Sequence, residues 1–269
     1  MRLSVVTFGS EGDTRPLAAL CRGLLDHGHE LKLFAEQSTL TLPQQLGIPC
    51  EALAGDIRST LPIADPKQEI RIADVMNTVK AVNAVIATNT ASWLRAVTEH
   101  ARDADAVLFS SLAVGVGLAL RQELRKPAIG LFFQPITPTR QFSSPMAPPM
   151  RLPGWMNRLT FRPAHRHMWS TCGKHAQAAR LEVFGTRANQ RLQLDGPMLY
   201  GVSRELVPQP SDWPVNHTMC GHWSPPASDW QPPDALRDFL DGGEPPIYAG
   251  FGSPSGFIRV KALQALIDA

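Results

Sequence analysis

The sequence has little net charge and no extended basic run, which argues against a nucleic-acid partner. Lys and Arg total 26 against 24 Asp and Glu, a formal net charge of +2 over 269 residues. A nucleic-acid-binding surface needs a stripe of basic side chains that neutralises many phosphates. One local concentration exists and leaves peripheral contact with an anionic membrane surface open: Arg151, Arg158, Arg162, His165, Arg166 and His167.

Cysteine is scarce, and no hydrophobic run approaches the length of a membrane span. The four cysteines are spread along the chain, at Cys21, Cys50, Cys172 and Cys220. None belongs to a C-x-x-C pair, so the sequence predicts neither a zinc site nor a disulfide framework, and no metal is expected. The first apolar run, Leu3 to Phe8, is too short for the core of a signal peptide. These absences favour a cytoplasmic protein.

The turn after that run lacks the glycine patterns of dinucleotide-binding and ATP-binding proteins. The fingerprint G-x-G-x-x-G would need glycine at positions 9, 11 and 14, but Glu11 and Thr14 occupy two of them. Glu36, at the end of the second expected strand, lies where a ribose-binding acid would lie. No lysine follows Gly12 as the Walker pattern requires. A dehydrogenase and a P-loop NTPase are therefore disfavoured.

The chain does contain an alternation of short apolar runs and amphipathic patterns. Leu3–Phe8 and Leu31–Ala35 are typical of strands buried on both faces, and Leu17 to Leu25 between them predicts a helix that ends at Gly28. Further strands are expected near 50–53, 106–109, 128–133 and 198–202, and further helices before 47, from 72 to 97 with a break near 88–90, and over 114–124. The βαβ alternation predicts an α/β fold with a parallel, doubly wound, Rossmann-like sheet.

Two proline-rich stretches interrupt this alternation. Six prolines fall between Pro135 and Pro153, which predicts a long extended loop of the kind that usually carries function. Ser224 to Pro246 predicts an interdomain linker. After it, Pro246 to Ser253 repeats the opening pattern of a strand that leads into a Gly-Ser turn. The expected domains are 1–223, a linker over 224–245, and 246–269 as the first strand and partial helix of a second domain.

Five short motifs span the chain in a fixed order. They are G-S-E-G-D-T-R-P at 9–16, Q-P-I-T-P-T-R-Q-F at 134–142, Y-G-V-S-R-E-L-V-P at 200–208 with D-W-P at 212–214, G-H-W at 221–223, and F-G-S at 251–253. They resemble motifs of the family-one glycosyltransferases, the UDP-glucosyl and UDP-glucuronosyltransferase superfamily, which modify sterols, antibiotic aglycones and rhamnolipid precursors. The resemblance implies a GT-B fold with an essentially complete acceptor-binding domain. The H-C-G-x-G-T motif with which these enzymes bind the sugar nucleotide is absent from the sequence, so the second domain is expected to be truncated.

The resemblance also implies a reaction. A hexose would pass, with inversion, from a UDP- or TDP-sugar to a hydroxyl of a hydrophobic acceptor such as a sterol, polyketide, lipid or antibiotic aglycone, with no further cofactor. Asp13 would be the base that takes the acceptor's proton, although an aspartate there can also simply cap a helix. Ser10, which can instead be a turn serine bonded to its own backbone, would contact the donor together with Gly12, Gly252 and Ser253.

Four residues in or beside the first proline-rich stretch are expected to bind the acceptor: Phe133, Gln134, Phe142 and Met146. An apolar rim that contains methionine suits a flat hydrophobic molecule. One of Phe132 and Phe133 is expected in the core, because successive strand residues face opposite sides of a sheet. A second function stays open at this stage, a truncated, non-catalytic acceptor-binding module or a helper subunit of a complete enzyme. The sequence does not indicate an oligomeric state.

Overall fold

The computed structural model describes residues 1–60, 72–148, 151–185, 192–225, 231–248 and 264. Within them, one seven-stranded sheet has the order β3-β2-β1-β4-β5-β6-β7, and every neighbouring pair is parallel. The strands are β1 (Arg2–Val6), β2 (Glu30–Glu36), β3 (Cys50–Leu53), β4 (Ala106–Ser110), β5 (Ala128–Phe132), β6 (Met198–Tyr200) and β7 (His217–Met219). The predicted parallel α/β sheet is confirmed.

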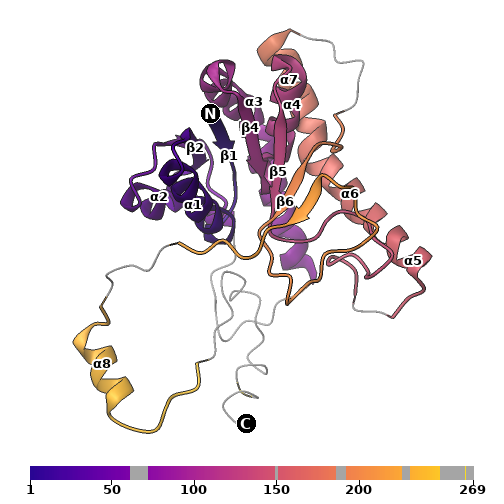
Figure 1. The fold of residues 1–269 in the computed structure, drawn as a ribbon. Helices are drawn as coiled ribbons and strands as arrows, with labels where there is room; N and C mark the ends of the chain where they lie inside the picture. The colour runs from indigo at the N-terminus through magenta and orange to yellow at the C-terminus, as the bar shows by residue number, and fades with distance from the viewer. Residues whose placement is uncertain (61–71, 149–150, 186–191, 226–230, 249–263, 265–269) are drawn as a thin grey trace.

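Helices cover both faces of the sheet, as Figure 1 shows. They are α1 (Glu11–Asp26), α2 (Thr41–Gln45), α3 (Ile72–Asp103), α4 (Val114–Leu124), α5 (Gly154–Leu159), α6 (Phe161–Met168), α7 (Lys174–Phe184) and α8 (Asp234–Asp241). α1 and α2 pack on one face, and α3, α4 and α7 pack on the other. None of the helices in the described ranges combines the length and apolar character needed to cross a bilayer.

The alternation of side chains along β1 explains the two cores. Leu3 and Val5 are buried with Leu17 of α1, whereas Val6 is buried on the opposite face with Trp93 of α3. Because neighbouring strand residues point to opposite faces, a strand with apolar residues on both faces needs helices on both sides. Each such fully buried side chain contributes about 1.5–3 kcal/mol of transfer free energy.

Two elements differ from the sequence prediction. The expected break near residues 88–90 is wrong, since α3 is continuous. The Asn89 side chain donates to the Val85 carbonyl (2.8 Å) and the Thr90 hydroxyl to the Ile86 carbonyl (2.5 Å), so both bond the preceding helical turn instead of interrupting it. The strand β7 was not predicted, because three residues beginning with His217 carry too short a pattern to recognise.

The C-terminal segment also differs in part. The expected linker contains the helix α8, and none of its residues is buried. Ile247 and Tyr248 were expected to begin a strand, but they lie outside any strand and are 96% and 92% exposed. The rest of that expected strand, and the helix after it apart from Gln264, lie outside the described residues.

The start of the first proline-rich stretch is fastened to the sheet by buried hydrogen bonds. The Thr137 hydroxyl lies 2.5 Å from the Tyr200 hydroxyl and 2.8 Å from Nδ1 of His217, while the Thr137 amide donates to Tyr200 (3.1 Å). The Trp213 indole donates to the Thr137 carbonyl at 3.2 Å. Burial raises the pKa of Tyr200 to about 12, so its hydroxyl stays protonated and can act as both donor and acceptor.

A second set of hydrogen bonds attaches the same proline-rich stretch. The Asp212 carboxylate accepts from the Thr139 hydroxyl (2.5 Å) and from the Arg140 amide (2.8 Å). Partial burial acts to raise the pKa of this carboxyl, but the hydrogen bonds from Thr139 and Arg140 and the nearby Arg158 lower it overall. The path of the loop after β5 is therefore fixed by hydrogen bonds to residues in and after β6.

Replacing Tyr200 with Phe tests this attachment. The ring keeps its contacts with Trp213 (centroids 4.7 Å apart) and Phe132 (6.1 Å), but Thr137 loses one of its hydrogen-bond partners. We expect Tyr200→Phe to lower the free energy of unfolding by about 1–2 kcal/mol, measured by urea denaturation at neutral pH. The matched control is Tyr248→Phe at the other tyrosine, which is exposed. Equal effects of the two substitutions would show that the Tyr200 hydroxyl does not fasten the loop.

Candidate functional site

The parallel pairing brings the residues expected in the site to one edge of the sheet. In a parallel sheet, all strands end on the same side, and ligands bind in the crevice outside those carboxyl ends. The turn with Gly9, Ser10 and Asp13 follows β1, and Gln134 follows β5, which lies two strands away in the same sheet. Asp13 and Gln134 therefore lie at the same edge of the sheet.

The turn after β1 is shorter than predicted, because α1 already begins at Glu11. Ser10 is the N-cap, and Asp13 is the third helical residue of a capping box. The Asp13 carboxylate accepts the Ser10 amide N–H at 2.8 Å and the Ser10 hydroxyl at 3.4 Å. Asp13 is half-buried, so the helix start orients the carboxylate and leaves part of it accessible.

Glycine at position 9 makes this arrangement sterically feasible. Gly9 has φ of +152°, and a Cβ atom placed on it would lie only 2.2 Å from Oδ2 of Asp13. Any larger residue would push the carboxylate away from the turn. A Cβ on Gly12 would meet the Ser10 hydroxyl at 3.5 Å, an ordinary contact, so packing in the described residues does not require glycine there. Contact of Ser10 and Gly12 with a donor stays a prediction.

Glu36, the residue in the position of a ribose-binding acid, is committed to the fold. It is 1% exposed, and its carboxylate accepts from the Ser38 hydroxyl (2.8 Å) and the Ile57 amide (3.2 Å). Burial raises the pKa of its carboxyl, and these two hydrogen bonds oppose that shift. With both oxygens occupied, Glu36 joins β2 to the segment after β3 instead of facing a ligand.

The four predicted acceptor-binding residues have unequal exposure. Gln134 is exposed, and Met146 is 64% exposed. Phe133 is half-buried with its ring edge-to-face against Trp223, with centroids 5.7 Å apart. Phe142 is also half-buried and packs beside Phe161. Phe133 and Phe142 pack against the cores on opposite faces of the sheet. Acceptor contact by these four residues therefore stays a prediction, with Gln134 and Met146 the more accessible pair.

Trp223, in the G-H-W motif, packs against residues at the ends of β5 and β6. A Cβ on Gly201 would lie 3.0 Å from the Trp223 ring and 3.2 Å from Phe133, so only glycine fits between the two aromatic residues without displacing them. This contact joins the ends of β5 and β6 to the segment after β7. Two of the sequence motifs thus meet at one place, beside the residue that precedes a third.

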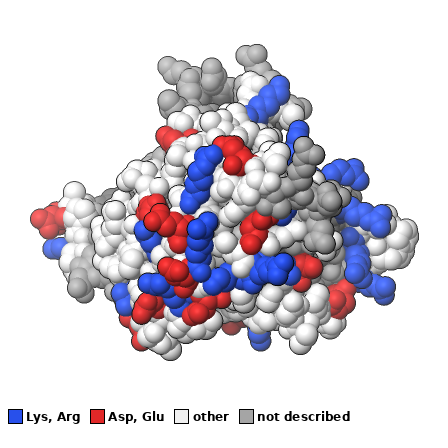
Figure 2. Space-filling view, turned by 90° about the horizontal axis from the view of Figure 1, so that it is seen from above, with Lys and Arg blue, Asp and Glu red and all other residues white. Residues whose placement is uncertain are grey.

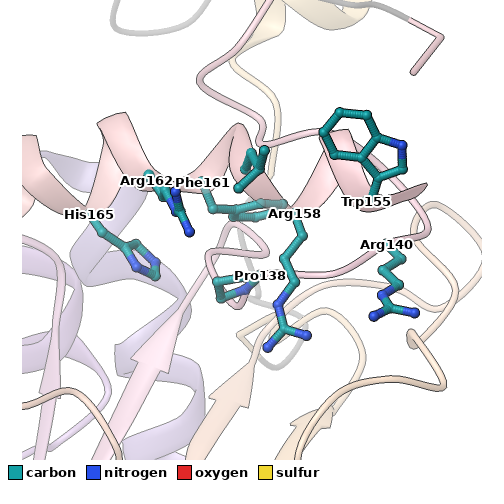
Figure 3. A pocket seen from close by; sticks show the side chains of 8 residues that line it. Pro138, Arg140, Trp155, Arg158, Phe161, Arg162 and His165 are labelled. Carbon is teal, nitrogen blue, oxygen red and sulfur yellow. The ribbon is translucent and has the colours of Figure 1, made fainter. Parts of the chain in front are cut away.

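A pocket of about 230 Å³ lies between the proline-rich loop and the helices α5 and α6 (Figure 3). It is lined by Pro138, Arg140, Trp155, Arg158, Leu159, Phe161, Arg162 and His165. The sequence analysis noted the basic residues only as a local concentration of charge. The signal it passed over is the spacing of Trp155, Arg158, Leu159 and Arg162, which places all four on one face of a helix.

Hydrogen bonds attach the loop to these helices. Nε2 of His165 lies 2.9 Å from the Ile136 carbonyl, and the Asn157 side chain donates to the Arg140 carbonyl at 2.9 Å. The Ser144 amide donates to the Thr160 hydroxyl at 2.7 Å, at the junction of α5 and α6. The loop and the two helices therefore form one packed unit beside the carboxyl edge.

The other predicted donor contacts cannot be placed. Gly252 and Ser253 lie outside the described residues. In the described part of the chain, no group of three or more His, Cys, Asp or Glu side chains is arranged to hold a metal ion.

Comparison with curated proteins finds relatives among glycosyltransferases, although no family model matches the chain. The chain is 29% identical over 262 residues to O-mycaminosyltylonolide 6-deoxyallosyltransferase of Streptomyces fradiae, covering 94% of this chain and 61% of that protein. It is 28% identical over 262 residues to the sterol 3-beta-glucosyltransferase of Emericella nidulans, covering 94% of this chain and 18% of that protein. The chain thus spans less than two thirds of the length of the first relative and less than a fifth of the second.

Comparison with solved structures gives the same fold. The glycotransferase of kitacinnamycin aligns with a TM-score of 0.53 at 18% identity, over 86% of this chain and 55% of that one. The calicheamicin glycosyltransferase aligns with a TM-score of 0.53 at 13% identity, over 85% and 56% of the two chains. At such identities the structural likeness shows the fold alone, and the curated relatives supply the sequence relationship. The chain is therefore similar in sequence to glycosyltransferases, and it has the Rossmann-like fold of the GT-B architecture.

Proposed function

We propose that this chain is the acceptor-binding part of an inverting glycosyltransferase that transfers a hexose from a nucleotide-diphosphate sugar to a hydroxyl of a hydrophobic acceptor. The observation that carries the proposal is the alignment of 94% of the chain with the deoxyallosyltransferase and the sterol glucosyltransferase. The same alignment favours this function over a non-catalytic module. A sterol, polyketide, lipid or antibiotic aglycone is the proposed class of acceptor.

In the proposed reaction, Asp13 is the general base. The acceptor hydroxyl attacks the anomeric carbon of the sugar and loses its proton to the Asp13 carboxylate, while the bond to the nucleotide diphosphate breaks on the opposite face. The position of Asp13 supports this role, because its carboxylate is held at the carboxyl edge of the sheet by the Ser10 amide. The first turn of α1 places partial positive charge near the carboxylate.

The donor would be held mainly by a nucleotide-sugar-binding domain. Ser10 and Gly12 at the start of α1 would meet its phosphates or sugar, together with Gly252 and Ser253. Because the H-C-G-x-G-T motif is absent from this sequence, we propose that the chain by itself does not complete transfer. A cytoplasmic location is also a proposal, which the four free cysteines support.

Asp13→Asn tests the base directly. Asparagine keeps an oxygen that can accept the Ser10 amide N–H but cannot take a proton, so the fold should persist while turnover falls roughly 100-fold or more. The assay follows sugar transfer by a polypeptide in which this chain is continued by a nucleotide-sugar-binding domain that carries the H-C-G-x-G-T motif.

The matched control is Asp56→Asn. The Asp56 carboxylate also accepts a nearby backbone amide, that of Ser59 (3.0 Å), but it belongs to a different turn. We expect the turnover of the Asp56→Asn variant to stay within about twofold of the parent, because this substitution changes only the group that accepts a turn amide. Unchanged turnover of Asp13→Asn at saturating substrates would assign Asp13 a structural role only.

Acceptor binding can be measured on the 269-residue chain itself. Met146→Ser removes an exposed apolar side chain from the proposed rim, and we expect roughly a fivefold loss of affinity for a sterol or macrolactone in calorimetry. Met76→Ser on α3 is the control, because Met76 is similarly exposed, at 51% against 64%. Equal affinities of the two variants would place the acceptor away from the loop.

A further inference from the structure

The helices α5 and α6 present a stripe of alternating apolar and basic side chains that the fold does not bury. Trp155, Arg158, Leu159 and Arg162 follow one another at helical spacing and line the same shallow pocket. Trp155 is 63% exposed and Leu159 is 39% exposed, although both are large and apolar. Figure 3 shows Trp155 near one end of the pocket, with Arg158 and Arg162 along the same helices.

Met146 is another exposed apolar residue, close to the junction of α5 and α6. It is 64% exposed and lies two residues after Ser144, whose amide is bonded to Thr160 between α5 and α6. Exposed apolar residues scattered singly need no explanation, but a cluster at one place marks a site of interaction. We name the surface formed by Met146, Trp155, Arg158, Leu159 and Arg162 the α5–α6 face.

The charge of this region is one-sided. No Asp or Glu occurs between Glu123 and Glu182, so the whole segment that forms the α5–α6 face lacks acidic side chains. Among the ion pairs of the described residues, none involves Arg140, Arg158 or Arg162. Asp212 is the acidic residue whose charge interacts with Arg158, and its carboxylate is already bonded to Thr139 and the Arg140 amide.

Figure 2 shows this asymmetry on the surface. Basic side chains gather at the right-hand edge, the side on which α5 and α6 lie in Figure 1, whereas acidic and basic side chains mix over the centre. The net charge of +2 therefore conceals a local excess of positive charge.

We propose that the α5–α6 face docks on the surface of an anionic lipid bilayer. Trp155, Leu159 and Met146 would enter the boundary between headgroups and acyl chains, while the arginines stay level with the phosphates. Each basic side chain near an anionic surface contributes about 1 kcal/mol of attraction. The exposure of Arg158 and Arg162 favours a broad surface over a small anion, since a site for a small anion would enclose its cations.

The docking does not depend on the proposed sugar transfer, but it bears on it. α5 and α6 lie beside the carboxyl edge of the sheet in Figure 1. A protein held by this face would therefore keep that edge close to the membrane, where apolar molecules concentrate.

Vesicle co-sedimentation of the 269-residue chain tests the proposal. We expect the chain to sediment with vesicles of phosphatidylcholine mixed with phosphatidylglycerol, to stay in solution with phosphatidylcholine alone, and to be released by molar salt, which shortens the Debye length to about 3 Å. Arg158→Gln/Arg162→Gln should lower the partition coefficient at least about tenfold, because it removes two attractive charges. Trp155→Ser should lower it several-fold without any change of charge.

The matched control is Lys80→Gln/Arg102→Gln. Lys80 and Arg102 are exposed on α3, and replacing them removes the same net charge. The partition coefficient should stay within about twofold of the parent because these charges lie elsewhere on the surface. Circular dichroism and urea denaturation confirm that each variant is folded. Equal losses in the two double variants would mean that only net charge matters, and equal sedimentation with both vesicle types would exclude an anionic surface. Either result, or unchanged partition of Arg158→Gln/Arg162→Gln, would overturn the proposal.

Discussion

The parallel pairing of the seven strands is the constraint on which the rest of the structure depends. Backbone donors and acceptors of a buried strand need partners on both sides, and the central strands β2, β1, β4, β5 and β6 all have them. Because every pair is parallel, each connection must cross the sheet and return to the same end. The turn after β1 and the long loop after β5 consequently open at one edge, which brings Asp13 and Gln134 to the same side of the molecule.

The residues that carry the family resemblance are also the residues that fasten this edge. Proline lacks an amide donor, so a proline-rich loop has to be attached by side chains. Thr137 bonds Tyr200 and His217, and Thr139 bonds Asp212, so the motif after β5 is bonded to both parts of the motif that follows it. The distribution of motifs along the chain therefore reflects the architecture of the site edge as much as its chemistry.

Charge is distributed in a way that the overall balance does not reveal. Several basic residues elsewhere have carboxylate partners, such as Arg22 with Asp26 and Lys32 with Glu51. The arginines of the α5–α6 face lie in a segment without acidic residues and project next to an exposed tryptophan. Exposed pairs of opposite charge contribute little to stability, whereas unpaired charges of one sign produce a field that attracts partners of the opposite charge.

The sequence by itself determined the fold class, because short, mainly apolar runs such as those of β1 and β2 are typical of strands in a sheet covered on both faces. It also placed Asp13 and the loop after β5 at the ends of strands, because the order of strand and turn patterns along the chain is enough to locate them. It misjudged the residues near Asn89, whose side chains bond the helix that they were expected to break. It could not reveal that Ser10 caps α1 while Asp13 bonds back to it, that Tyr200 and His217 share Thr137, or that Trp155 lies outside the core. Those outcomes depend on contacts between residues that are distant in the chain or on local backbone angles, and only the tertiary structure decides them.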